Sequence, residues 1–145
     1  KKMTLNPYLN FPGNTEEAFN FYKSVFGGEF AMVQRFGEMP GPDGKKTPAE
    51  FQNKIMHISL PIGNGNILMG TDAIEQLGFK LSTGNNFYIC IAPDSKQEAD
   101  QLFKGLSAGG KVNMPMKDMF WGAYYGDFTD KFGIKWMINY NNPKN

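Results

Sequence analysis

The sequence predicts an α+β fold made of two tandem β-α-β-β-β modules. Three observations predict it: an amphipathic helix that occurs twice, a Gly-Gly pair at the end of each copy, and matching strand-like segments on either side. The first module is expected at about residues 4–72 and the second at about 86–140, with a linker at 73–85. Residues 1–145 together are expected to form a single domain.

The repeated helix is the clearest element. Residues 14–26 and 95–107 both carry apolar side chains at the i, i+3, i+4, i+7 spacing of a helix with one buried face. The two segments superpose without gaps. Side chains that can cap the free N–H groups of the first turn, and glycines that can end a helix, stand at matching places. These are Asn14 or Thr15 and Gly27-Gly28 in the first copy, and Asp94 or Ser95 and Gly109-Gly110 in the second.

Strand-like segments surround each helix in the same order. In the first copy they are residues 5–11, 29–36, 55–62 and 66–71. In the second copy they are residues 87–92, 111–117, 121–128 and 134–140. The turns at 63–65 and 129–133 are each expected to join the last two strands of a copy into a hairpin.

Composition and charge exclude several classes of protein. The chain has 145 residues, of which 41% are hydrophobic and 20% charged, as in globular domains. Fifteen basic residues face fourteen acidic ones without clustering, so nucleic acid is not an expected partner. No run reaches the ~20 apolar residues of a membrane helix, and no signal peptide follows Lys1-Lys2. With Cys90 as the single cysteine, a cytoplasmic protein without disulfides is expected.

Four segments together resemble the vicinal oxygen chelate superfamily of glyoxalase, bleomycin resistance and dioxygenase proteins, and within it the PhnB-like branch. They are YLNFPGNTEEAFNFYKSVFGGEF (8–30), KIMHISL (54–60), NILMGTD (66–72) and FWGAYYGDFTDKFGIKWMINY (120–140). The resemblance implies that each module is a curled mixed sheet around a cavity, with its helix on the outer face. It also implies a homodimer, and, in members that use a metal, ligands from the first and last strands of each module.

The positions that the resemblance assigns to metal ligands hold unsuitable side chains. Aligned on the helices and the last strands, they are Asn6, Met69, Phe87 and Met137, and a shift of one residue on the first strands offers Pro7 and Tyr88 instead. Metal catalysis of this kind needs His, Glu or Gln donors, and thioethers bind such metals poorly. We therefore predict no metal and no cofactor.

The same positions predict a cavity for an apolar or aromatic guest, since Met and aromatic side chains suit such ligands. The expected lining residues are Asn6, Tyr8, Met69, Phe87, Trp121 and Met137. For Trp121, packing in the core is an equal alternative to a place on the rim of the pocket. Cys90 is expected to be a buried, inert thiol on the face packed by the helix.

His57, Asp72 and Tyr8 are the candidates for acid–base chemistry. Pairing the strands across Asn64-Gly65 sets His57, the single histidine, opposite Asp72. The two residues could form an acid–base relay or a structural hydrogen bond. Asp72 is three positions from Met69, so it is expected to face away from the cavity if Met69 faces into it, and His57 with it. This favours the structural interpretation.

Three functions remain open. The leading hypothesis is a protein that binds a small molecule without a metal, to sequester a toxic compound or to sense one. The alternative is a metal-dependent or His57-assisted lyase, isomerase or dioxygenase. The third is an interaction module. A methyltransferase, the name given to some relatives in this branch, is not indicated, because the glycine-rich segment at 63–66 lacks the third glycine and the following helix of a dinucleotide fingerprint.

Overall fold

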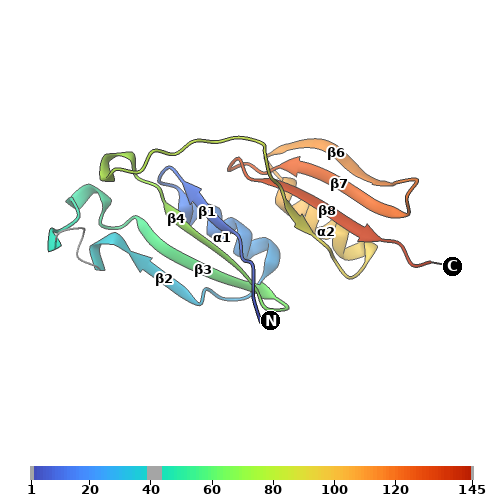
Figure 1. The fold of residues 1–145 in the computed structure, drawn as a ribbon, viewed down its shortest axis with the longest axis horizontal. Helices are drawn as coiled ribbons and strands as arrows, with labels where there is room; N and C mark the ends of the chain where they lie inside the picture. Colours follow the sequence, from blue (N-terminus) through green and yellow to red (C-terminus); the bar gives the residue numbers. More distant parts are fainter. Residues whose placement is uncertain (1, 39–43, 145) are drawn as a thin grey trace. The chain divides into compact units, whose positions relative to one another are not determined.

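A computed structural model of the chain describes residues 2–38 and 44–144. The chain divides into two compact units, Lys1–Ser82 and Thr83–Asn145 (Figure 1). The boundary between them falls inside the predicted linker. Among the described residues, no helix combines the length and the apolar character needed to cross a membrane.

Unit 1 is a four-stranded mixed sheet packed by one face against the helix α1 (Thr15–Phe26). Its strands are β1 (Tyr8–Phe11), β2 (Met32–Arg35), β3 (Ile55–Gly63) and β4 (Asn66–Asp72). They lie in the order β1-β4-β3-β2. The β1–β4 pair is parallel, whereas β4–β3 and β3–β2 are antiparallel.

Unit 2 repeats this plan. Its strands are β5 (Ile89–Ile91), β6 (Lys111–Asp118), β7 (Ala123–Thr129) and β8 (Lys135–Asn141), and its helix is α2 (Lys96–Ser107). The order is β5-β8-β7-β6, with β5–β8 parallel and the other pairs antiparallel. The predicted α+β fold with two β-α-β-β-β modules is therefore confirmed.

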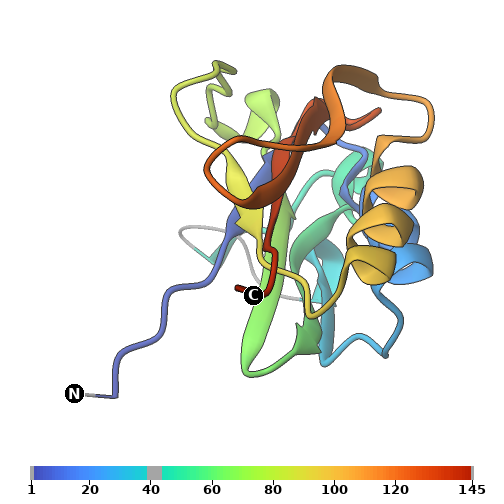
Figure 2. The ribbon, with the colours of Figure 1, turned by 90° about the vertical axis from the view of Figure 1, so that its right-hand side faces the viewer.

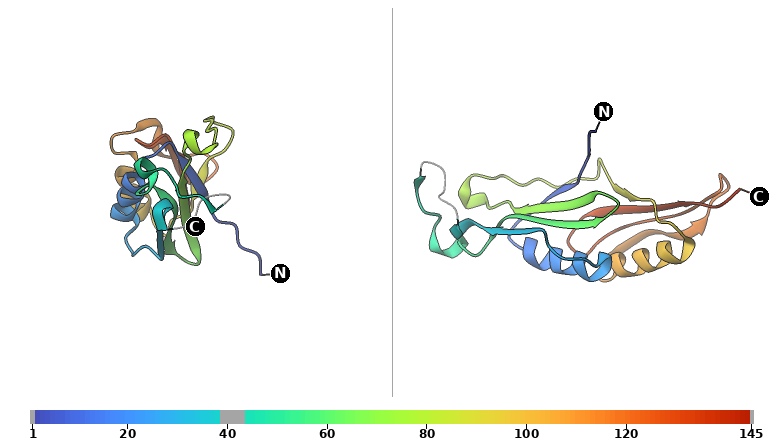
Figure 3. Two further views of the ribbon diagram at one scale, coloured as in Figure 1. Left: turned by 90° about the vertical axis from the view of Figure 1, so that its left-hand side faces the viewer. Right: turned by 90° about the horizontal axis from the view of Figure 1, so that it is seen from below.

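The core of unit 1 lies between α1 and its sheet, as the side view in Figure 3 shows. Phe19 of α1 packs edge-on against Phe11 of β1 and against Tyr22, with ring centroids 6.3 and 5.6 Å apart. The strand residues buried on this side are Leu9, Phe11, Ile58, Leu60 and Leu68. The other face of the sheet carries no helix, and we call it the open face of unit 1.

Unit 2 is packed in the same way (Figure 2). Phe103 of α2 meets Phe128 of β7 at 5.0 Å between ring centroids, and Trp136 and Ile138 of β8 are buried beside them. Asp130 holds the turn before β8, and its carboxylate also accepts a hydrogen bond of 2.9 Å from the Trp136 indole. The sheet face opposite α2 is the open face of unit 2.

The two helices begin in different ways. Ser95 caps α2 as predicted, because its hydroxyl accepts a hydrogen bond from the Glu98 backbone N–H at 3.0 Å. Asn14 precedes α1, but its side chain makes no capping bond. Instead, the Thr15 N–H donates to the carboxylate of Asp72 at 2.9 Å. The prediction of a local side-chain cap is therefore wrong for α1.

Candidate functional site

Alternation along β1 places Tyr8 on the open face of unit 1. Leu9 and Phe11 are 3% and 1% exposed and pack toward α1, whereas Tyr8 is 45% exposed. Successive side chains of a strand point to opposite faces, so Tyr8 and Asn10 project away from the helix. The open face is the surface on which the resemblance implies that a ligand is bound.

Two rows of side chains cross this open face, with one residue from each strand. The methionine row consists of Met32, Ser59, Met69 and Tyr8, each the register partner of the next. The polar row, one step along, consists of Gln34, His57, Thr71 and Asn10. Neither row contains Asp, Glu, Lys or Arg. The open face of unit 1 therefore offers thioether and aromatic surface beside neutral hydrogen-bonding groups.

Tyr8 and His57 contact each other directly, and we call them the Tyr8–His57 pair. The Tyr8 hydroxyl lies 3.1 Å from His57 Nδ1, and the rings are 5.6 Å apart between centroids. Partial burial raises the pKa of the Tyr8 phenol, and a hydrogen bond with Thr71 offsets part of the increase. The phenol is thus protonated at neutral pH and has a proton to donate.

The predicted pairing of His57 with Asp72 is wrong. Counting back from the turn at 64–65 sets these residues opposite each other, but β3 and β4 instead pair Ile58 with Gly70. The true register differs by one residue and brings His57 beside Thr71. Since a shift of one residue moves a side chain to the other face, His57 lies on the open face and not on the helix face.

The cause is an irregularity in β3 between Pro61 and Gly63. Proline has no N–H to give to the hydrogen-bond ladder, so a bulge beside it is readily accommodated. Beside the turn, Gly63 pairs with Asn66, as the count from Asn64-Gly65 predicts. Beyond the bulge, Pro61 pairs with Ile67, one residue away from the predicted partner. Pro61 is therefore the residue from which this change of register could have been predicted.

Asp72 lies on the helix face, as expected, and is 3% exposed. One carboxylate oxygen accepts from the Thr15 N–H at 2.9 Å and the other from the Ile55 N–H at 2.7 Å. The carboxylate therefore ties α1, β3 and β4 together. The sheet separates it from His57, so the structure does not bring the two into an acid–base relay.

The open face of unit 2 repeats the two rows with different side chains. Its methionine row consists of Met114, Asp127, Met137 and Cys90. The next row holds Lys117, Tyr125 and Asn139. Met137 thus takes the place of Met69, and Tyr125 the place of His57.

Tyr125 and Asp127 form the polar contact of this second open face. The Tyr125 hydroxyl donates to the Asp127 carboxylate at 2.9 Å. Burial, followed by this hydrogen bond and the negative charge of Asp127, raises the pKa of Tyr125 to about 12. The pair is thus a phenol that donates to an aspartate oxygen.

The expectation that Cys90 is buried under the helix is wrong. Ile89 and Ile91 pair with Trp136 and Ile138, which are buried, so the two isoleucines occupy the helix face. Cys90 alternates with them and is exposed, on the open face. Partial burial by its neighbours raises the pKa of the thiol, so the thiol is protonated at neutral pH.

Asn6 and Phe87 are not counterparts. Tyr8 lies beside Met69 as Cys90 lies beside Met137, and counting from these pairs sets Tyr88 at the place of Asn6. Both predicted alignments, Asn6 with Phe87 and Pro7 with Tyr88, are therefore wrong by one residue. The Asn6 side chain accepts a hydrogen bond from the Ile67 N–H at 3.0 Å, and Phe87 is 65% exposed.

Trp121 lies in the turn between β6 and β7 and is 57% exposed. Its ring stacks edge-on against Phe120, with 5.0 Å between centroids. The alternative of Trp121 in the core is thus excluded. Its part in a ligand site stays a prediction, since neither row of the open face includes it.

The residues do not fit the divalent metal of the metal-using relatives. On the first and last strands, the side chains that face each other are Tyr8 with Met69 and Cys90 with Met137. Such metals prefer imidazole and carboxylate donors. Within residues 2–38 and 44–144, no group of three or more His, Cys, Asp or Glu side chains could hold a metal ion.

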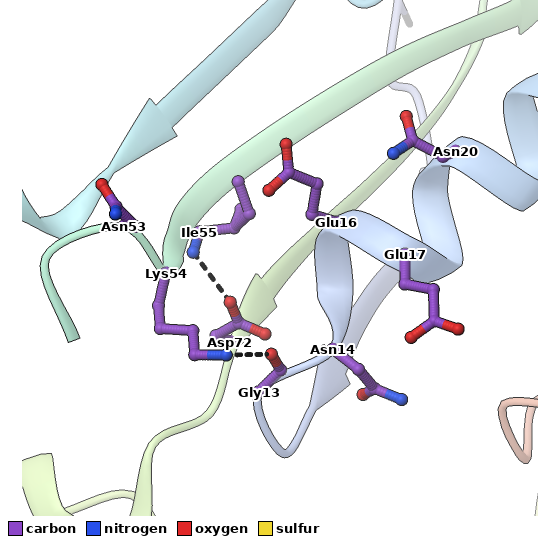
Figure 4. Close-up of a pocket in the computed structure, with 9 residues that line it drawn as sticks. All are labelled: Gly13, Asn14, Glu16, Glu17, Asn20, Asn53, Lys54, Ile55 and Asp72. Atoms are coloured by element: carbon purple, nitrogen blue, oxygen red, sulfur yellow. Dashed lines mark hydrogen bonds between the residues drawn. The ribbon is translucent and has the colours of Figure 1, made fainter. Parts of the chain in front are cut away.

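A hollow of about 640 Å³ beside the start of α1 was not predicted from the sequence (Figure 4). Glu16 binds Arg35 through two hydrogen bonds of 2.9 and 2.7 Å, which lower the pKa of the Glu16 carboxyl. Lys54 donates to the Gly13 carbonyl at 2.9 Å. These contacts, with those of Asp72, join the helix to β2, β3 and β4. We therefore interpret the hollow as a structural junction, in which Glu16, Lys54 and Asp72 bind neighbouring parts of the protein. Its lining residues are Gly13, Asn14, Glu16, Glu17, Asn20, Asn53, Lys54, Ile55 and Asp72.

Comparisons with known proteins identify a family and its relatives. A family model described as 3-demethylubiquinone-9 3-methyltransferase matches residues 3–139. Protein YjdN of Escherichia coli (strain K12) is 32% identical over 146 residues, which cover 94% of this chain and 95% of that protein.

Solved structures share the fold of this chain. Protein PA1353 from Pseudomonas aeruginosa is 36% identical, with a TM-score of 0.83 over 98% of this chain and 100% of that one. A PhnB protein from Bacillus cereus shares the fold at 24% identity, with a TM-score of 0.73 over 95% and 99% of the two chains. Structures of glyoxalase-related proteins share the fold at lower identity. The chain therefore belongs to the family that bears the 3-demethylubiquinone-9 3-methyltransferase name, and it has the fold of a PhnB protein and of glyoxalase-related proteins.

Proposed function

We propose that the chain binds a small apolar or aromatic molecule on the open faces of its sheets, without a catalytic metal. The observation that supports the proposal most is the methionine row of each open face, with Met69 beside Tyr8 and Met137 beside Cys90. Methionine side chains are flexible and polarizable, and they adapt to flat or irregular ligands. Their place on the strands is the one from which metal-using relatives would supply ligands.

The polar groups beside each methionine row would orient such a guest. Ligand sites combine mostly apolar walls with a few placed hydrogen-bonding groups. The Tyr8–His57 pair supplies these groups in unit 1, and Tyr125 with Asp127 supplies them in unit 2. A sequestering or sensing role needs this arrangement and no chemical step.

The methyltransferase in the name of the family model is not part of the proposal. The glycine-rich segment at 63–66 is the tight turn between β3 and β4, with Asn64 at a φ of 52°. A strand follows this turn, whereas a dinucleotide-binding loop leads into a helix.

The proposal is tested by measuring the affinity of naphthalene and acetophenone for the full chain and for a Met69→Ala variant. Loss of the Met69 side chain is expected to weaken binding about tenfold, which corresponds to roughly 1.4 kcal/mol of apolar contact. Met3→Ala is the matched control, because Met3 is 68% exposed and lies outside the strands. Equal affinities for the two variants, or no binding of either compound, would contradict the proposal.

An enzyme is the second candidate, and the contact between Tyr8 and His57 favours it. A phenol and an imidazole at 3.1 Å can pass a proton to or from a bound molecule. Asp72 would not take part from the helix face. Once a turnover reaction is found, a His57→Ala variant with unchanged kcat would remove His57 from its mechanism.

A further inference from the structure

We infer that the open face of unit 1 selects an aromatic molecule that carries a neutral hydrogen-bond acceptor, such as an aryl ketone, and that His57 donates the hydrogen bond. The inference rests on the proposed function, since it names the class of molecule that this face binds. His57 would contact the ligand oxygen through Nε2. Tyr8 would be a positioning residue that fixes the protonation of the ring.

The contact between Tyr8 and His57 decides which ring nitrogen carries the proton. A neutral imidazole has one nitrogen that donates and one that accepts. The Tyr8 hydroxyl lies 3.1 Å from Nδ1, and an imidazole nitrogen is a stronger base than a phenol oxygen. The phenol therefore donates to Nδ1, and the ring proton stays on Nε2. The pair thus offers one N–H group to a ligand.

Thr71 does not take over the role of Tyr8. Its hydroxyl lies 2.6 Å from the Met56 carbonyl oxygen and also bonds the Tyr8 phenol, a bond that offsets part of the increase in the pKa of Tyr8. Thr71 therefore acts on the oxygen of Tyr8. Among the described residues, Tyr8 is therefore the side chain that forms the hydrogen bond with His57 Nδ1.

The surroundings of the pair favour a neutral acceptor over a carboxylate. Neither row of this open face contains Lys or Arg. Arg35, which follows Gln34 on β2, is turned to the helix side and held by Glu16 and by the Asn53 carbonyl at 2.7 Å. A bound carboxylate would find no Lys or Arg among the residues of the two rows to offset its lost hydration. A ketone, amide or ester oxygen needs only one donor.

The methionine row supplies the surface for the ring of the ligand. Met69 lies between Tyr8 and Ser59, and Met32 lies on the other side of Ser59. Ser59 is only 8% exposed, so the surface here is chiefly thioether and phenol. Contacts of sulfur with aromatic rings are favourable. A flat aromatic body with one acceptor oxygen at its end matches this combination.

The binding test uses acetophenone and α-methylstyrene, which have the same shape but differ in one carbonyl oxygen, replaced by a CH₂ group. The ratio of the acetophenone affinity to the α-methylstyrene affinity is expected to fall about fivefold from the full chain to His57→Leu, the effect of one neutral hydrogen bond. Without the donor, the carbonyl loses its hydration with no hydrogen bond in return. His57→Gln should keep the ratio, because its amide can place an N–H near the position of Nε2.

A nitrogen NMR measurement of the ring tests the role of Tyr8. His57 is the only histidine, so the imidazole signals of the full chain belong to one residue. In alkaline buffer, where imidazole is neutral, Nε2 is expected to carry the proton and Nδ1 to be unprotonated. Tyr8→Phe should give a mixture of the two forms and reduce the preference for acetophenone, while α-methylstyrene binds as before.

Each outcome decides between the two proposals. If neither compound binds, the proposed function of unit 1 fails, and the inference fails with it. If the compounds bind but His57→Leu leaves the ratio of their affinities unchanged, the proposed function stands and the inference is wrong. A proton found on Nδ1 would also overturn the inference, since Nε2 would then accept and the ligand would have to donate.

Discussion

At the scale of single residues, two aspartates show how the register of a strand decides the role of a carboxylate. Asp72 faces the helix, where its two oxygens hold two backbone N–H groups. Asp127 faces the open side, where it accepts from Tyr125. The sequence predicted the side of Asp72 but not its partners, because both partners lie far from it along the chain. Only the packed sheet brings them together.

An Asp72→Asn substitution is expected to destabilise the chain by about 2 kcal/mol. The amide keeps one acceptor oxygen, but its NH₂ group would face the N–H of Thr15 or Ile55, which leaves a buried donor without an acceptor. Urea unfolding followed by circular dichroism measures the change. Glu75→Gln is the control, since Glu75 is exposed. A loss of stability no greater than that of the control would refute the role given to Asp72.

The phenol of Tyr125 should be among the last to ionise. Its pKa is raised to about 12 in the fold, whereas an unfolded tyrosine ionises near 10. The folded state therefore holds this proton more tightly. The resulting stabilisation is present below pH 10 and is lost as the pH rises from about 10 to 12.

Absorbance at 295 nm, recorded from pH 9 to 13, checks this expectation. Tyr124 also has a pKa of about 12, so Tyr125→Phe should reduce the absorbance change near pH 12. Asp127→Asn should move the part due to Tyr125 to lower pH by removing the charge that faces the phenol. A titration of Tyr125→Phe that matches the wild type would show that the phenol ionises elsewhere.

At the scale of elements, the helices were predicted well and the strand registers less well. Apolar spacing and caps gave α1 and α2 to within one residue at their N-terminal ends. The strands were found in the right order, since apolar runs and turns are local signals. The register of β3 on β4 was missed because the bulge beside Pro61 adds one residue. That single residue moved His57 to the open face.

Register also explains why β4 needs a glycine under the helix. A Cβ atom on Gly70 would lie 2.6 Å from Phe19 Cε1 and 3.1 Å from the Leu9 carbonyl oxygen. Gly70→Ala is therefore expected to lower the free energy of unfolding by about 1–3 kcal/mol through overpacking.

The matched control for this substitution is Gly84→Ala, because no heavy atom lies within 4 Å of the added Cβ there. Thermal unfolding of both variants gives the comparison. Equal midpoints for the two variants would mean that α1 can move away from β4 without cost.

At the scale of the whole molecule, the repeat of one module gives two open faces with different chemistry. Unit 1 presents neutral polar groups, and unit 2 presents a phenol beside a carboxylate. The family resemblance predicted the fold, because caps and glycine stops are local and repeat in order. It did not predict the chemistry of the site, because ligand-facing positions on strands vary freely without affecting the core.

The full chain is expected not to bind a divalent metal ion tightly, because suitable donor side chains do not face each other on the first and last strands. After incubation with Zn²⁺, Ni²⁺ or Mn²⁺ and gel filtration, far less than one ion per chain is expected, because Met69 and Met137 offer only thioethers. Elemental analysis measures the bound metal. Tight uptake of one ion per chain would overturn both this expectation and the proposal of a metal-free site.

The homodimer stays a prediction, and light scattering can test it. A dimer would have a mass of about 33 kDa, twice the 16.3 kDa of the chain. A mass of one chain at micromolar concentration would argue against pairing.

The capping of α1 by the Asp72 carboxylate has a consequence for folding during synthesis on the ribosome. Asp72 is 57 residues beyond Thr15, whose N–H it holds, so the first turn of α1 has no side-chain cap until β4 has been synthesised. Ser95 stands directly before α2 and caps it through Glu98. The cap of the second helix is therefore complete as soon as residues 95–98 have been made, whereas that of the first is complete only once β4 has been synthesised.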